Sequence, residues 1–392
     1  MGINSATIRQ DFEYRPLDPE TLANPHVSYA ALRALPGLYW HDGMKSYVAS
    51  RYDTCKYVLS TNAYFAKDRG RIGVEIPEEK RSVQTEDPPN RLGLRQEFRH
   101  ELHETDLSGL CATVGDRFDQ RLEAAGADFD FVTEVAYPTA LDLTATVVGL
   151  SSEQGLDYMT THRALQRATD GGLEPQRLEE GRAAGARLHA YAAEWLEQDG
   201  VEGLLAPARS FAEKYPTGYA VNTLAGMVNA SFSTAGSFTT GIFNLMVRDP
   251  ALVEQARETL ANGQGFRAVS EFLRFLAPAQ ATSRVVVEDC NVDGTDLKRG
   301  DTVVTLMGSA NRDPAQYDDP DKLNLSRPRN RHLSFAAGPH MCLGKKLAEE
   351  WGQELIRRLV STNVLQTLRV GAPEFLDSAT VRSIISLPTQ RA

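Results

Sequence analysis

The sequence has few cysteines and no long hydrophobic run. Its four cysteines, Cys55, Cys111, Cys290 and Cys342, are widely spaced and form no CxxC pair, which argues against a disulfide framework. The first twenty residues lack an apolar core of signal-peptide length. No stretch approaches the ~20 apolar residues that a transmembrane helix needs. We therefore expect a cytoplasmic protein that does not enter a membrane.

The chain also lacks an excess of positive charge. Lys and Arg number 42 against 52 Asp and Glu, so the net charge is −10, which argues against nonspecific nucleic-acid binding. With 392 residues, 42% of them hydrophobic, the chain is long enough for a large core. There is no internal repeat, low-complexity tract or Gly/Ser linker. We expect residues 1–392 to form one domain.

Hydrophobic periodicity predicts helices over most of the chain from Arg91 to Arg274. The clearest amphipathic helix spans about 174–198, and a second long helix runs from about Gly218 to Arg248, where Pro250 prevents its continuation. After Arg284, short strands with Gly-containing turns follow, then a helix over about 345–361 and a strand-like tail. A short helix near 24–33 and a hairpin turning near 42–43 precede all of these. The fold class is mainly α with a small β part.

One cysteine lies in unusual surroundings. Cys342 is in the loop "FAAGPHMCLG", residues 335–344, with glycines on both sides and a predicted helix directly after it. A zinc site would need about four ligands, and His340 and Cys342 supply two. A catalytic thiol would need a histidine from elsewhere in the chain. A structural buried cysteine does not explain Gly338 and Gly344.

The remaining interpretation is a thiolate that binds a flat cofactor. Glycines let the backbone approach such a group closely. Backbone N–H groups and the start of the next helix stabilise a negative sulfur. Haem held by a cysteine thiolate is the known case.

This loop resembles the haem-binding loop of the cytochrome P450 superfamily. The matching pattern is Phe335-x-x-Gly338-x-His340-x-Cys342-x-Gly344. Bacterial members usually have Gly where this chain has Ala336. The resemblance implies that the fold is the cytochrome P450 fold, with haem b between the long distal helix and this loop. It makes Cys342 the iron ligand and His340 a partner of a haem propionate.

Other motifs follow in the order that the family shows. Glu271-Phe272-Leu273-Arg274 resembles its ExxR helix, whose Glu–Arg pair supports the haem side of the core. Arg284 matches a family position that contacts a propionate. The segment "EDPPNRLGLR" resembles the start of the helix that crosses the haem, with Arg91 at the position that is usually His or Trp and Arg95 one turn later. Two arginines at i and i+4 share a helix face and suit two carboxylates, although they could also form a plain basic surface.

The long helix before Pro250 corresponds to the family's oxygen-side helix. Its segment "ASFST", residues 230–234, retains the family's threonine as Thr234, but Ser233 replaces the usual acid and Ser231 the usual glycine. In the family, activation of O2 needs protons, which the threonine and a water hold and the acid supplies. Serine is no net proton source at neutral pH, but it can relay a proton through water. These hydroxyls could instead bond to carbonyls one turn earlier.

The resemblance implies an enzyme, a monooxygenase that oxidises a small molecule, with Thr234 and Ser233 as candidate catalytic residues. Bacterial specialised metabolism is the expected setting. The missing acid leaves open an oxidation without oxygen insertion, such as aryl coupling of an aromatic cyclic dipeptide or peptide. The segment "AGSF", residues 235–238, weakly resembles a family member that couples the two tyrosines of such a dipeptide. A haem-thiolate sensor without turnover is a more distant alternative.

By alignment with the family, four segments line the substrate pocket: the loop from Tyr64 to Asp87, the positions Gly226, Asn229 and Ala230, residues 279–282 and residues 383–385. The candidates are Asn229, Ala230, Ala279, Gln280 and Ile384, with Asn229 and Gln280 as polar groups in an otherwise apolar site. Family members of this type receive electrons from NAD(P)H through a ferredoxin reductase and a ferredoxin. Arg99, Lys345 and Lys346 are candidates for a basic docking face.

Overall fold

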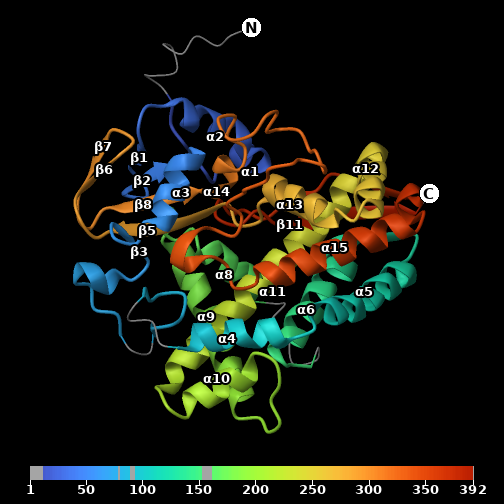
Figure 1. Cartoon of the computed structure of the whole chain (residues 1–392), viewed down its shortest axis with the longest axis horizontal. Coiled ribbons are helices and arrows are strands. Elements are labelled where there is room, and N and C mark those ends of the chain that lie inside the picture. The colour runs from blue at the N-terminus through green and yellow to red at the C-terminus, as the bar shows by residue number, and fades with distance from the viewer. Residues whose placement is uncertain (1–11, 78–79, 89–92, 152–160, 392) are drawn as a thin grey trace.

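The computed structural model describes residues 12–77, 80–88, 93–151 and 161–391. Helices dominate these ranges, and the strands form small sheets beside them (Figure 1). This agrees with the predicted fold class. The helices are α1 Pro19–Ala23, α2 Pro25–Ala34, α3 Tyr52–Ser60, α4 Leu94–Glu104, α5 Leu107–Ala124, α6 Tyr137–Val148, α8 His162–Ala168, α9 Gln176–Leu196, α10 Leu205–Ala212, α11 Thr217–Arg248, α12 Pro250–Ala261, α13 Gly265–Leu276, α14 Met307–Ala310 and α15 Lys345–Ser361.

The strands are short and lie mostly in the first and last thirds of the chain. They are β1 Tyr39–His41, β2 Ser46–Ala49, β3 Phe65–Ala66, β4 Asp128–Asp130, β5 Ala281–Val286, β6 Cys290–Val292, β7 Thr295–Leu297, β8 Thr302–Leu306, β9 Leu368–Val370, β10 Glu374–Phe375, β11 Ile384–Ser386 and β12 Pro388–Arg391. The largest sheet has the order β1-β2-β8-β5-β3. Its β2 and β8 are parallel, with Val48 opposite Val304, whereas β5 and β8 are antiparallel.

The long helices begin and end close to their predicted bounds. The central helix α11 ends at Arg248 because Asp249 caps the next helix, accepting hydrogen bonds from the N–H groups of Ala251 and Leu252 at 3.0 and 3.3 Å. Pro250 occupies the first turn of α12, where a missing N–H costs nothing. The helix predicted over 345–361 is α15. Strand β4 was not predicted, because its three residues lie inside a mainly helical region and pair with β12 at the far end of the chain.

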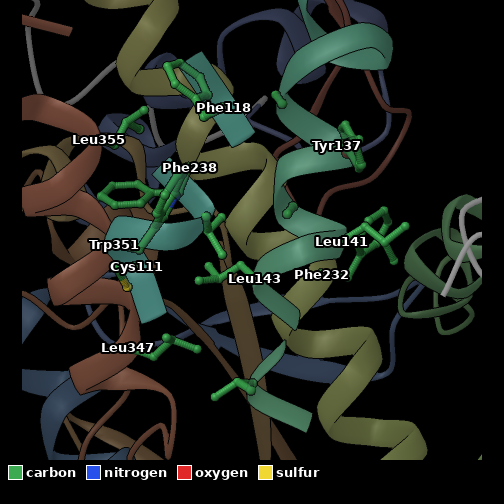
Figure 2. Packing of buried hydrophobic residues seen from close by; sticks show 14 of the residues in the cluster. Cys111, Phe118, Tyr137, Leu141, Leu143, Phe232, Phe238, Leu347, Trp351 and Leu355 are labelled. Atoms are coloured by element: carbon green, nitrogen blue, oxygen red, sulfur yellow. The ribbon is translucent and has the colours of Figure 1, made fainter. Parts of the chain in front are cut away.

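The main hydrophobic core lies where α5, α6, α11 and α15 meet. Figure 2 shows Phe238 of α11 close to Trp351 of α15, with Phe118 of α5 nearby. The indole N–H of Trp351 donates to Thr239 Oγ1 at 2.9 Å, which satisfies the polar atom of a fully buried ring. At Gly352, an added Cβ would lie 2.7 Å from Val269 and 3.0 Å from Phe238. The packing of α15 against α11 and α13 therefore depends on that glycine.

A buried ion pair joins α13 to the segment that leads to the cysteine loop. Glu271 and Arg274 are both fully buried, with their charged atoms 2.8 Å apart. Arg327 adds a second guanidinium, with its Nε 3.1 Å from Glu271 Oε2. The ExxR pair is therefore part of the interior and not of a solvated helix face. None of the helices in the described part of the chain is long and apolar enough to cross a membrane.

Candidate functional site

The cysteine loop is folded tightly between α3 and α15. The N–H of Cys342 donates to the carbonyl of Phe335 at 2.9 Å, which closes the loop. Gly338 has φ +70, and a Cβ there would lie 2.5 Å from the carbonyl oxygen of Leu59. Position 338 therefore requires glycine because of its left-handed backbone and its close contact with the end of α3. The sequence analysis expected a different reason, namely close approach of the backbone to a cofactor. Ala336, where the family usually has Gly, has φ 57 and so takes a strained left-handed conformation.

The sulfur of Cys342 differs from the other cysteines in its surroundings. Cys55 and Cys111 are buried, whereas Cys342 is exposed. Even so, desolvation by the surrounding protein raises the pKa of the Cys342 thiol, against the opposing effects of the Gly344 N–H and the charge of Arg95. The Cys342 side chain is therefore accessible, although nearby protein disfavours its charged form. A Cβ at Gly344 would meet only this sulfur, at 3.9 Å, so glycine leaves the space beside it open.

These observations separate the four interpretations of Cys342. A structural cysteine would be buried, as Cys55 is. A catalytic thiol would have a histidine within hydrogen-bond reach of its sulfur, and none of the described residues donates to or accepts from Cys342 Sγ in this way. Among the described residues, no three His, Cys, Asp or Glu side chains lie close enough together to hold a metal ion. A single sulfur that loses its proton on binding the metal of a cofactor fits all three findings.

Helix α11 has an open face that carries the predicted threonine. Gly226, Ala230 and Thr234 follow each other at intervals of four residues and retain solvent exposure, in a helix whose other faces are largely buried. Residues at i and i+4 lie on one face of a helix. The Thr234 hydroxyl donates to the carbonyl of Ala230 at 2.7 Å. Thr234 is therefore both on the open face and bonded back to its own helix.

Ser233 has a different environment from Thr234. It is buried, and its Oγ has no hydrogen-bond partner among the described residues. Ser233 lies three residues after Ala230, at the edge of the open face, but the surrounding packing covers it, whereas Thr234 keeps some exposure. This geometry favours Thr234 over Ser233 as the hydroxyl that meets a ligand.

Positive charge gathers at a second part of the site, near Asp87. Arg284 is 3% exposed, and its guanidinium donates only to Ser283 O at 2.8 Å and Thr282 Oγ1 at 3.4 Å. Desolvation lowers its pKa to about 10. No carboxylate within the described ranges forms an ion pair with it. A buried guanidinium without an anion is costly, so this site fits a ligand that carries carboxylates.

Lys67 adds to this charge and was missed from the sequence. Desolvation and, to a smaller extent, the charge of Arg284 lower the pKa of its ammonium to about 8, against the opposing charge of Asp87. The nearby carboxylate of Asp87 already contacts His340 Nε2 at 2.5 Å. Desolvation raises the pKa of Asp87, but hydrogen bonds from His340 and from backbone N–H groups outweigh it and leave that pKa lowered. One signal of its partial burial was present in the sequence, because Lys67 directly follows the apolar pair Phe65-Ala66.

The remaining predicted cofactor residues are placed as follows. Arg95, in the first turn of α4, donates to the carbonyl of Met341, beside Cys342. Phe335 is partly buried and packs against the main core. Arg91 lies outside the described residues.

The predicted pocket residues divide into two groups. Asn229, Ala230 and Ala279 retain exposure, whereas Gln280 and Ile384 are buried. The Gln280 amide accepts from Tyr29 OH at 3.0 Å and donates to Ala277 O at 2.6 Å. This arrangement favours a structural role for Gln280 over contact with a substrate.

Comparison with known proteins gives consistent results. The family model described as Cytochrome P450 matches residues 267–380. Nocardicin C N-oxygenase of Nocardia uniformis subsp. tsuyamanensis is 27% identical, covering 97% of this chain and 99% of its own. Cytochrome P450(MEG) of Priestia megaterium is 26% identical, covering 89% and 90%. The crystal structure of CalO2 superposes with a TM-score of 0.82 at 24% identity, covering 97% and 98%.

Replacing Lys67 by Met should stabilise the ligand-free protein but weaken the binding of a ligand that carries carboxylates. Without it, stability should rise, because the desolvated ammonium is gone. Since the pKa of about 8 in the folded protein lies below the usual pKa of a lysine, ~10.4, this gain in stability should be complete below pH 8 and vanish as the pH approaches the usual lysine pKa. Urea denaturation at several pH values measures it.

With haem bound, the same change should speed transfer of haem to apomyoglobin by about threefold to tenfold, the effect of losing roughly 1 kcal/mol. Lys56→Met, on the exposed face of α3, is the matched control and should leave transfer unchanged. Equal transfer rates for Lys67→Met and the parent protein would remove Lys67 from the site.

Proposed function

Because the chain belongs to the cytochrome P450 family, we propose that it is a haem-thiolate monooxygenase that oxidises a small organic molecule of bacterial specialised metabolism. In this proposal residues 1–392 act as one haem-binding domain. The observation that carries it is the exposed sulfur of Cys342, whose thiol pKa is raised by the protein around it. When bound, the haem supplies the iron at which O2 is activated.

The residues around the sulfur would hold the haem by distinct interactions. Cys342 binds the iron through its thiolate, and the N–H of Gly344 stabilises the negative sulfur. Arg284, which is buried, and Lys67, which is partly buried, pair with haem carboxylates, and these supply anions to both cations. His340, Arg95 and Arg91 complete the set of predicted propionate partners. Phe335, Gly338 and Gly344 shape the loop beneath the haem.

The open face of α11 would hold the substrate and a water. Ala230 offers an apolar surface, flanked by Asn229, and Ala279 adds to it from the segment before β5. The Thr234 hydroxyl, anchored on Ala230 O, accepts a hydrogen bond from a water and keeps its proton near the reacting oxygen. Ser233 takes part only if water reaches its buried hydroxyl.

Electrons would come from NAD(P)H through a ferredoxin reductase and a ferredoxin. Arg99 on α4 and Lys345 and Lys346 at the start of α15 are exposed. The contact of Arg95 with Met341 brings α4 and the cysteine loop together, so these cations flank the sulfur side. An acidic ferredoxin suits such a face.

A second candidate function is oxidation without oxygen insertion, such as aryl coupling of an aromatic cyclic dipeptide. The observation that favours it is serine in place of an acid at position 233. Optical titration of the ferric protein distinguishes the two, because displacing water from the iron changes its spin state. A saturable shift with Tyr- and Trp-containing cyclic dipeptides supports coupling. A shift with only terpenes or macrolide cores supports hydroxylation.

Replacing Cys342 by Ser should abolish the thiolate band in the spectrum of the reduced protein with carbon monoxide, because a serine oxygen does not replace the sulfur ligand. Cys290→Ser, which changes a partly exposed cysteine on β6, is the matched control and should keep the band. An unchanged carbon monoxide spectrum in Cys342→Ser would refute the proposed ligand.

Replacing Thr234 by Ala should raise the peroxide released per NAD(P)H consumed severalfold, because the water that holds the proton loses its anchor. The measurement is peroxide yield during turnover with a substrate found by titration. Thr240→Ala removes the same kind of back-bond, from Thr240 to Gly236 O, on a buried face. This control should leave coupling unchanged. If both variants release equal peroxide, Thr234 has no part in proton delivery.

A further inference from the structure

A polar side chain lies at one end of the open face of α11. Residues 81–84 run along this helix, where Asn222 Nδ2 donates to Arg81 O at 3.1 Å and the N–H of Val83 donates to Thr223 Oγ1 at 3.1 Å. Gln84 Nε2 then donates to the carbonyl of Thr223 at 3.2 Å. The segment and its glutamine are therefore held in place by α11 itself.

Gly226 makes room for the Gln84 amide. A Cβ at position 226 would lie 2.7 Å from Nε2 and 3.4 Å from Oε1. The amide thus lies directly over the glycine, and a side chain at position 226 would have to displace it. Gly226 does not have a positive φ, so close approach, and not backbone conformation, accounts for glycine in the interior of a helix, where it is unfavourable.

The orientation of the amide follows from its one hydrogen bond. A carbonyl accepts only from the NH2 side, so Nε2 faces Thr223 O and Oε1 faces away. Within the part of the chain that the structure describes, no donor contacts Oε1, and the Gln84 side chain is exposed. An acceptor of fixed direction is therefore available beside the open face.

The helix also sets the distance of this acceptor from Thr234. Gly226, Ala230 and Thr234 are successive positions on one face, and a helix rises about 1.5 Å per residue, so Gln84 lies about 12 Å along the axis from the level of Thr234. Ala230, which lies between them on this face, has a small side chain.

We propose that Gln84 determines specificity by accepting a hydrogen bond from a hydroxyl or amide N–H of the substrate, about two helical turns from the atom that is oxidised. This inference rests on the proposed function, which places the reaction near Thr234. The substrate class is then a molecule with a donor about 10 Å from its reacting position. A substrate without that donor leaves the Gln84 carbonyl dehydrated and unpaired, which is how such sites reject analogues.

The test uses ligands that are anchored at the haem iron through an imidazole nitrogen, since the natural substrate is unidentified. A phenyl or biphenyl spacer joins the imidazole to a terminal hydroxyl, and each has a matched methyl ether. Nitrogen coordination shifts the haem absorption, so affinity is measured without turnover. For one of the two spacers, the parent protein should bind the hydroxyl compound at least about fivefold more tightly than the matching methyl ether.

Two variants locate the effect at Gln84. Gln84→Met keeps the side-chain length without the amide and should bring the hydroxyl-to-ether ratio close to one. Gly226→Ala keeps the amide but displaces it, and should also lower the ratio while leaving the melting temperature unchanged or higher. Gln255→Met, an exposed position on α12, should keep the parent ratio.

The outcomes separate this inference from the proposed function. The role of Gln84 is overturned if the parent protein does not prefer the hydroxyl compound over its ether with either spacer. It is also overturned if the preference persists in Gln84→Met. In both cases the haem-thiolate assignment stands. Failure of the parent protein to give a thiolate band with carbon monoxide overturns the proposed function instead.

Discussion

The buried carboxylate of Glu271 is the group on which the position of the cysteine loop depends. It is fully buried and pairs with Arg274 and Arg327, so its desolvation is offset only while all of its partners stay in place. Desolvation raises its pKa, but the hydrogen bonds and charges of these partners outweigh it and leave that pKa lowered. The N–H of Asn324 and the amide of Asn330 complete its hydrogen bonds at 2.9 Å each. Breaking one pairing would leave a buried charge unpaired, which makes the cluster rigid.

That rigidity reaches the sulfur through a short series of contacts. Arg274 also donates to the carbonyl of Asn311 at 2.8 Å, and Asn311 holds the approach to the loop by donating to Ser334 Oγ at 2.8 Å. Ser334 in turn donates to Leu273 O at 2.7 Å, back on α13. The loop then folds back, and the carbonyl of Phe335 accepts a hydrogen bond from the N–H of Cys342. The sulfur is therefore held by buried polar contacts on one side and by α15 on the other.

The sequence allowed the fold and the cysteine loop to be predicted because both depend on local signals. Helix α15 has the predicted bounds because of its hydrophobic period and the glycine before it, and the motif around Cys342 is contiguous. Lys67 and Gln84 lie in the loop that alignment placed at the pocket, but their individual roles could not be found in this way. Their importance comes from burial beside Arg284 and from contact with α11, and both arise only when distant segments meet. Conversely, Gln280 matched a pocket position by alignment, yet its amide is engaged by Tyr29.

The replacement of the usual acid by Ser233 also has a physical explanation in the packing of α11. Position 233 is buried, and even a neutral hydroxyl there finds no partner among the described residues. An ionised carboxylate at the same place would be far more costly without a cation to pair with it. In the proposed mechanism, residue 233 is therefore not a source of protons for Thr234. Under the proposed function, the exposed strip through Gly226 and Ala230 is the part of α11 that water and substrate would share. The way in which a substrate fills that strip would then control both its orientation and the access of water, so specificity and proton supply would be coupled on one helix face.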